Sequence, residues 1–234
     1  MKKIIFLLAV VFAYNSSFAE TGLELIQQAS KAMKAEKRSE FTTIKRTMTS
    51  KQQGMSTSIT FYKKGNDKYR LEIKTPMGEQ VIIKNADVCA VIAPMVQDLN
   101  PEQWGQIYNQ IVSQDSNPNE YMEEEGVEFE LIGTEDFNGK SCQKIKVKTE
   151  EAQEGIENSY IYIDGVTKWM SGLGLELAEE QGKIEILFSD MKKVKGMVYA
   201  GLIKTMYNGQ EVNHTSIDNF EVNIELEDSL FVKP

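Results

Sequence analysis

The spacing of hydrophobic and polar residues changes along the chain, and this change predicts the order of its elements. Between residues 20 and 38, apolar side chains recur every three or four positions, which is typical of an amphipathic helix. Thr21 is expected to cap this helix, with Glu24 as its capping-box partner. From Met55 onward the period becomes two, which indicates β-strands.

Strand-like alternation recurs through most of the remaining chain. The segments are 55–62, 69–74, 80–84, 88–92, 127–133, 141–149, 158–163, 183–188, 197–207 and 211–223. Short turns such as Asn208-Gly209 require neighbouring segments to be antiparallel, and one apolar face predicts a sheet covered on one side. A long meander curls, so we expect a mainly β fold with some α, namely a single curved antiparallel sheet or open half-barrel. It should have about 10–11 strands and helices over its concave face, all in one domain spanning residues 20–234.

A second helical pattern interrupts the strands after Asn100. Trp104, Ile107, Tyr108 and Ile111 recur at the spacing of one helix face, and Asn100 with Pro101 is suited to begin a helix. We interpret this segment as a lid helix over the sheet. Ordinary packing into a core is the alternative interpretation.

The first nineteen residues are expected to be a secretory signal peptide. A basic start is followed by an apolar run over residues 4–13, and Ser17 and Ala19 are small residues suited to a cleavage site. The run is too short for a bilayer span, which needs about 20 helical residues. We therefore expect cleavage after Ala19, no lipid anchor because no cysteine follows, and a periplasmic location.

Composition and charge exclude several classes of function. The net charge of −9 argues against a nucleic-acid partner, and 41% hydrophobic residues argue against disorder. His214 is the only histidine, which excludes a multi-histidine zinc site, and in its Thr- and Asn-rich strand a structural or exposed role is expected rather than that of a general base. The Gly172-Leu173-Gly174-Leu175 segment lacks the third glycine of a dinucleotide-binding loop. No metal site and no catalytic residue is expected.

The two cysteines leave two interpretations open. A disulfide between Cys89 and Cys142 would persist in an exported protein and could contribute roughly 4 kcal/mol by closing a loop of about 50 residues. Both cysteines lie in alternating apolar segments, however, which slightly favours two buried free thiols.

Several segments carry a resemblance to a known family. They are the N-terminal helix leading into a strand meander, the basic loop and aromatic strand at 62–72 with its following Pro76 turn, the strand–Asp–turn step at 161–165, and the closing pattern at 217–223 and 227–234. On these segments the chain resembles the periplasmic outer-membrane lipoprotein carriers of the LolA, LolB and LppX fold. The resemblance covers most of residues 20–234 at the level of pattern.

The resemblance implies a non-enzymatic lipid carrier. It implies an apolar cavity between sheet and helices that binds acyl chains of lipoproteins or another lipid and shuttles them towards the outer membrane. It further implies no cofactor, a monomer, and partners such as an inner-membrane release transporter and an outer-membrane acceptor. The family's lid-holding arginine is not matched, because Lys63-Lys64-Gly65 occupies that neighbourhood and Arg70 lies beyond it.

Strand parity supplies the candidate cavity residues. They are Ile59, Phe61, Tyr69, Leu71, Ile73, Val81 and Ile83. The alternative is that these side chains pack directly beneath the helices without a cavity. Two other functions stay open: a lipid- or lipoprotein-sensing regulatory module of the same fold, and a secreted hydrolase that uses a carboxylate pair across a polar cleft.

Overall fold

The computed structural model describes residues 20–111, 117–122, 126–149, 155–179 and 181–233. The predicted signal peptide therefore lies outside the described residues. The helical elements are α1 (Gly22–Met33), η1 (Ala35–Glu40), α2 (Pro101–Ile111), α3 (Pro118–Met122) and η2 (Asp228–Phe231). The strands are β1 (Thr43–Gln52), β2 (Met55–Lys64), β3 (Lys68–Thr75), β4 (Gly78–Lys84), β5 (Cys89–Ala93), β6 (Gln97–Asp98), β7 (Val127–Phe137), β8 (Lys140–Thr149), β9 (Ile156–Asp164), β10 (Met170–Leu177), β11 (Gly182–Val194), β12 (Met197–Tyr207) and β13 (Gln210–Val222).

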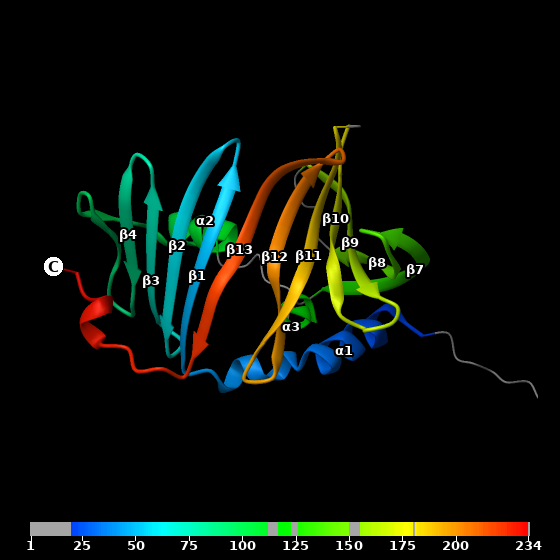
Figure 1. The fold of residues 1–234 in the computed structure, drawn as a ribbon, viewed down its shortest axis with the longest axis horizontal. Helices are drawn as coiled ribbons and strands as arrows, with labels where there is room; N and C mark the ends of the chain where they lie inside the picture. The colour runs from blue at the N-terminus through cyan, green and yellow to red at the C-terminus, as the bar shows by residue number, and fades with distance from the viewer. Residues whose placement is uncertain (1–19, 112–116, 123–125, 150–154, 180, 234) are drawn as a thin grey trace, which may run out of the picture.

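The described strands form one open antiparallel sheet of 13 strands, which confirms the predicted fold class (Figure 1). Their order is β6-β5-β4-β3-β2-β1-β13-β12-β11-β10-β9-β8-β7, so the first and last strands pair at the centre. Ile44 lies opposite Val222 and Gln52 opposite Asn213 in this central pair. The sheet thus has an N-terminal wing, β1–β6, and a C-terminal wing, β7–β13.

The position of the helices follows from this topology. The chain leaves β6 at one edge of the sheet and enters β7 at the other edge, so its connection must cross the sheet. Helices α2 and α3 belong to this crossing, and α1 lies along the C-terminal wing (Figure 1). None of the helices in the described part has the length and apolar character that a membrane crossing requires.

Local signals in the sequence begin the helices and close the hairpins. Thr21 and Glu24 form a capping box at α1, with the Glu24 backbone N–H donating to Thr21 Oγ1 at 3.2 Å. At α2, the Gln103 backbone N–H donates to Asn100 Oδ1 at 2.8 Å. The Asn208-Gly209 turn between β12 and β13 has positive φ at both residues, as a tight hairpin turn requires.

Two core clusters form on the helix-covered face, one centred on the N-terminal wing and extending onto β12 and β13, the other on the C-terminal wing. On the N-terminal wing, Trp104 of α2 packs with β1–β5 residues such as Phe61 and Leu71. On the C-terminal wing, Leu25 and Ile26 of α1 pack with the residues of β8–β12. We call these the α2 cluster and the α1 cluster.

The C-terminal tail covers the opposite face of the N-terminal wing. Phe231 is 2% exposed, and its carbonyl accepts a hydrogen bond from Asn85 Nδ2 at 2.9 Å. Arg70 Nη1 donates to the Leu230 carbonyl at 3.0 Å, and Lys68 pairs with Asp228 at 2.7 Å. The tail is therefore an integral part of the fold.

The sheet contains three strands that the hydrophobic pattern did not predict. They are β1, β6 and β10, and β1 lies at the centre of the sheet. In β1 the helix-covered face carries Arg46 and Ser50 beside Ile44 and Met48, which weakens the apolar alternation. In β10 glycines occupy alternate positions, as in Gly172 and Gly174.

Candidate functional site

The predicted cavity residues on β2 and β3 lie on the helix-covered face, where they form a packed core. Ile59 pairs with Ile73, and Phe61 with Leu71, across the two strands. Tyr69 completes this set and belongs with Ile73 to the residues packed against the α2 cluster. Phe61 is 2% exposed and Leu71 fully buried.

Aromatic rings fill the space between these strands and α2. The Tyr69 ring lies 5.6 Å from that of Trp104 and 6.0 Å from that of Tyr108, measured between centroids. Phe61 contacts Tyr69 with a centroid distance of 6.2 Å. Tyr69, Leu71 and Ile73 thus serve the packing of α2, which was the alternative interpretation of the sequence.

The predicted lid residues Trp104, Ile107 and Tyr108 contact this cluster from α2. Trp104 is 9% exposed, while Ile107 and Tyr108 are half-buried. The backbone of Ile111 ends α2, and its side chain lies outside the described residues.

Val81 and Ile83 lie on the other face of the sheet. Val81 is the cross-strand partner of Glu72, and Ile83 that of Arg70, whereas Leu71 pairs with Ile82. Since side chains alternate between faces, Ile82 belongs with the α2 cluster and its two neighbours point away from it. The expectation that Val81 and Ile83 share a face with Phe61 and Leu71 is therefore wrong.

A cavity with a largely apolar lining lies on the C-terminal wing. Its volume is about 550 Å³, within the range of small-molecule binding sites. Its apolar lining comes from alternate positions of β8, β9 and β10, with one side chain from α3: Val147, Ile156, Ile161, Leu173, Leu175 and Tyr121. Lys146, Lys148, Thr149, Glu157, Asn158, Ser159 and Tyr160 complete the described lining. We call it the wing cavity.

The wing cavity follows from the register of three strands. Leu173 lies opposite Ile161, and Leu175 lies opposite Ser159, so the leucines of β10 face the same side as the α1 cluster. The sequence signal was present in the Gly-Leu-Gly-Leu alternation at 172–175. The glycines weaken the hydrophobic strand pattern, and the cavity residues were therefore missed.

A central cavity of about 410 Å³ lies where the two wings meet. Met48, Ile59 and Ile203 give it an apolar part, and the side chains of Arg46, Ser50, Gln52, Thr205, Val212, Asn213 and Thr215 line the rest. Arg46 is 3% exposed and lies 5.9 Å from the centroid of the Phe61 ring. Of the predicted cavity residues, Ile59 borders this central cavity.

A further cavity of about 550 Å³, bordered by Phe61 and Tyr108, lies between η1, α3 and β2. Its surroundings are charged: Arg38, Lys63 and Glu120 line it, and Arg38 pairs with Glu120 at 3.8 Å. Burial and the neighbouring Arg38 lower the pKa of Lys63. Among the cavities described, the wing cavity therefore has the more suitable lining for an apolar ligand.

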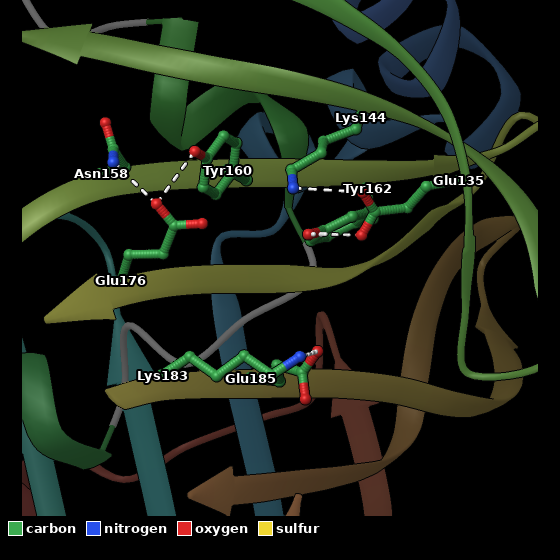
Figure 2. A network of polar contacts seen from close by, with 8 residues as sticks. All are labelled: Glu135, Lys144, Asn158, Tyr160, Tyr162, Glu176, Lys183 and Glu185. Atoms are coloured by element: carbon green, nitrogen blue, oxygen red, sulfur yellow. Dashed lines mark hydrogen bonds and ion pairs between the residues drawn. The ribbon is translucent and has the colours of Figure 1, made fainter. Parts of the chain in front are cut away.

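The opposite face of the C-terminal wing carries a network of polar contacts (Figure 2). Tyr162 donates to Glu135 at 3.2 Å, and Lys144 pairs with the same carboxylate at 3.1 Å. Tyr160 donates to Glu176 at 3.1 Å, and Asn158 Nδ2 donates to it at 2.7 Å.

The phenols of this network are held in the protonated form. Burial, followed by the hydrogen bond to Glu176, raises the pKa of Tyr160 to about 12. Burial and the charge of Glu135 also raise the pKa of Tyr162 well above its usual value. The tyrosines are therefore hydrogen-bond donors at neutral pH, on the face of the C-terminal wing opposite α1.

The two cysteines are free thiols on different wings. Cys89 lies on β5 and Cys142 on β8, near opposite edges of the sheet. Both thiols are free; Cys142 is buried as the free-thiol interpretation expected, whereas Cys89 is half-buried. Within the described residues no group of three His, Cys, Asp or Glu side chains is arranged to hold a metal ion.

Comparisons with known proteins identify the fold. The sequence matches no protein-family model and no curated protein. A DUF1329 family protein from Desulfovibrio piger has a similar structure, with a TM-score of 0.58 at 13% identity over 91% of this chain and 98% of that one.

Two further structures agree with this result. A LolA superfamily protein from Nitrosomonas europaea gives a TM-score of 0.56 at 11% identity, covering 92% of this chain and 99% of that one. A putative outer membrane lipoprotein-sorting protein domain from Vibrio parahaemolyticus gives 0.52 at 12% identity, covering 87% and 97%. The chain therefore has a LolA-like fold, as the resemblance in its sequence implied.

Proposed function

We propose that the protein is a periplasmic carrier that binds the acyl chains of lipoproteins or of another lipid and shuttles them towards the outer membrane. The observation that carries this proposal is the wing cavity, whose apolar side chains lie on the helix-covered face of a LolA-like sheet. Each CH₂ group transferred from water into such a site contributes about 0.8 kcal/mol. An acyl chain crossing an aqueous compartment therefore needs a shielded site of this kind.

The proposed acyl site is built from Leu173, Leu175, Ile161 and Val147, with Tyr121 of α3 at its border. Helix α3 is held to the α1–η1 segment by polar contacts, including Ser30 with Asn119 at 2.5 Å and Arg38 with Glu120 at 3.8 Å. Such contacts stabilise a segment less than burial in an apolar core does. This suits a segment that must move when cargo enters.

A carboxylate-dependent hydrolase has less support. Glu157 is the one carboxylate among the described residues that line the wing cavity, so these residues offer no acid–base pair. Glu135 and Glu176 lie on the opposite face, where each accepts a hydrogen bond from a tyrosine. The carrier proposal includes no catalytic residue and no cofactor.

A titration with a fluorescent acyl probe tests the proposal. Leu173→Trp fills the wing cavity from within and should abolish saturable probe binding. Leu71→Met is the matched control, because it nearly conserves volume in the α2 cluster and should bind as the wild type does. Absence of saturable binding by the folded wild-type protein would overturn the proposal.

A further inference from the structure

Exposed apolar side chains gather at one end of the sheet. Of the ten large hydrophobic residues that are exposed in the described part of the chain, four lie on or beside the β1–β2, β3–β4 and β5–β6 turns. They are Met55 at 54% exposure, Met77 at 89%, Met95 at 78% and Val96 at 54%. We call these four residues the methionine rim.

The strand register places all of them at the same end. Gln52 pairs with Met55, Thr75 with Gly78, and Val81 with Ala93, so the three turns of the N-terminal wing point in one direction. Figure 1 shows these turns at the upper ends of the strands. Tyr207 and Val212, which are 42% and 39% exposed, flank the β12–β13 turn at this end as well.

Two of the cavities also reach this end. Thr149 and Ile156, which line the wing cavity, are the terminal residues of β8 and β9 nearest to it. Gln52 and Val212 of the central cavity lie at the corresponding ends of β1 and β13. The rim therefore lies at the same end of the sheet as one edge of each of these two cavities, and Met55 of the rim is the cross-strand partner of Gln52, which lines the central cavity.

We propose that the methionine rim docks onto the surface of a lipid bilayer, with Met55, Met77, Met95 and Val96 entering the boundary between headgroups and acyl chains. This inference goes beyond the proposed carrier function and rests on it for one step, namely that the cavity must approach a bilayer to exchange an acyl chain. Insertion of a few apolar side chains gives reversible binding that scales with the buried apolar area.

The arrangement fits a bilayer better than a protein partner. A stable protein interface buries about 800 Å² on each side over a continuous surface. The rim instead presents separate side chains on successive turns, with charged residues such as the Lys74–Glu79 pair between them. Flexible methionine side chains adapt to a fluid phase at little cost.

Vesicle flotation with the full chain tests the inference. Phosphatidylcholine vesicles, with and without phosphatidylglycerol, should carry the wild-type protein to the top of a density gradient. The double variant M77S/M95S should show a partition coefficient about tenfold lower, because two inserting side chains are lost. Both residues lie in exposed turns, so folding should be unaffected.

Val166 provides the matched control. It is 90% exposed in the β9–β10 turn, at the opposite end of the sheet. V166S should float as the wild type does, and M77L/M95L should retain binding. A wild-type protein that stays at the bottom of the gradient, or an equal loss in V166S and M77S/M95S, would overturn the docking proposal.

The acyl-probe titration separates this inference from the carrier function. M77S/M95S should bind a soluble acyl probe with unchanged affinity, because neither residue lines a described cavity. Flotation of a wild-type protein that binds no acyl probe would leave the docking in place and remove the carrier function.

Discussion

The rings of Phe137 and Tyr162 stack face to face, with centroids 3.8 Å apart and planes inclined by 7°. They lie against the glycines of β10: a Cβ on Gly172 would come within 2.6 Å of the Phe137 ring, and a Cβ on Gly174 within 3.0 Å of the Tyr162 ring. The leucines that alternate with these glycines line the wing cavity on the other face. Strand β10 thus supports an aromatic stack on one face and a proposed ligand site on the other.

Gly172→Ala is expected to destabilise the protein by about 1–3 kcal/mol, because the added methyl group would overlap the Phe137 ring and the Ile186 backbone. Urea unfolding followed by far-UV circular dichroism measures this change. Gly105→Ala in α2 is the control: its Cβ would meet nothing within 4 Å, and alanine should stabilise the helix by about 0.5–1 kcal/mol. Equal stability of the two variants would contradict the close approach at Gly172.

Stability should fall as the pH rises from 10 towards 12. The unfolded chain ionises its tyrosines near pH 10, whereas Tyr160 in the folded protein keeps its proton until about pH 12. The unfolded state therefore binds fewer protons in this window, and the free energy of unfolding decreases with pH. Tyr160→Phe should make stability less dependent on pH in this window. The denaturation midpoint at several pH values measures this dependence. An unchanged slope in the variant would show that Tyr160 titrates normally.

Phe231→Ala should cost about 3–5 kcal/mol of stability, because the ring is 2% exposed where the tail crosses the sheet. Acyl-probe binding by the remaining folded protein should persist, since the tail lies on the face opposite the cavities. Val232→Ala is the control, because Val232 is 55% exposed and its truncation should change stability little. Thermal unfolding measures the stability of both variants. Equal midpoints would contradict the conclusion that the tail is an integral part of the fold.

The sequence was sufficient to predict the sheet, its antiparallel pairing, α1 and α2, whereas α3 was not predicted. Alternation and turn residues are local properties, so Phe61 and Leu71 could be assigned to one face from their spacing alone. The same reasoning failed for β1, because Arg46 occupies a buried position of the central strand. It failed for β10 because glycine replaces a larger residue wherever Phe137 or Tyr162 needs the space.

The location of the candidate site could not be obtained in this way. The alternation of side chains along a strand identifies the face on which each one lies. Whether the space between sheet and helices is filled on a given wing depends on how side chains from distant segments fit together. Tyr69, Trp104 and Tyr108 fill the N-terminal wing with aromatic rings. On the C-terminal wing the smaller Val147 and Ser159 leave a cavity beside Leu173. Such differences in volume appear only once the strands are in register.

Photo-cross-linking with a diazirine-bearing fatty acid, followed by peptide mapping, tests the central claim most directly. The probe should label peptides from β8, β9 and β10, and excess unlabelled fatty acid should compete for this labelling. Labelling confined to β2–β4 or α2 would contradict the assignment of the wing cavity. A folded protein without competable labelling would contradict the carrier function itself.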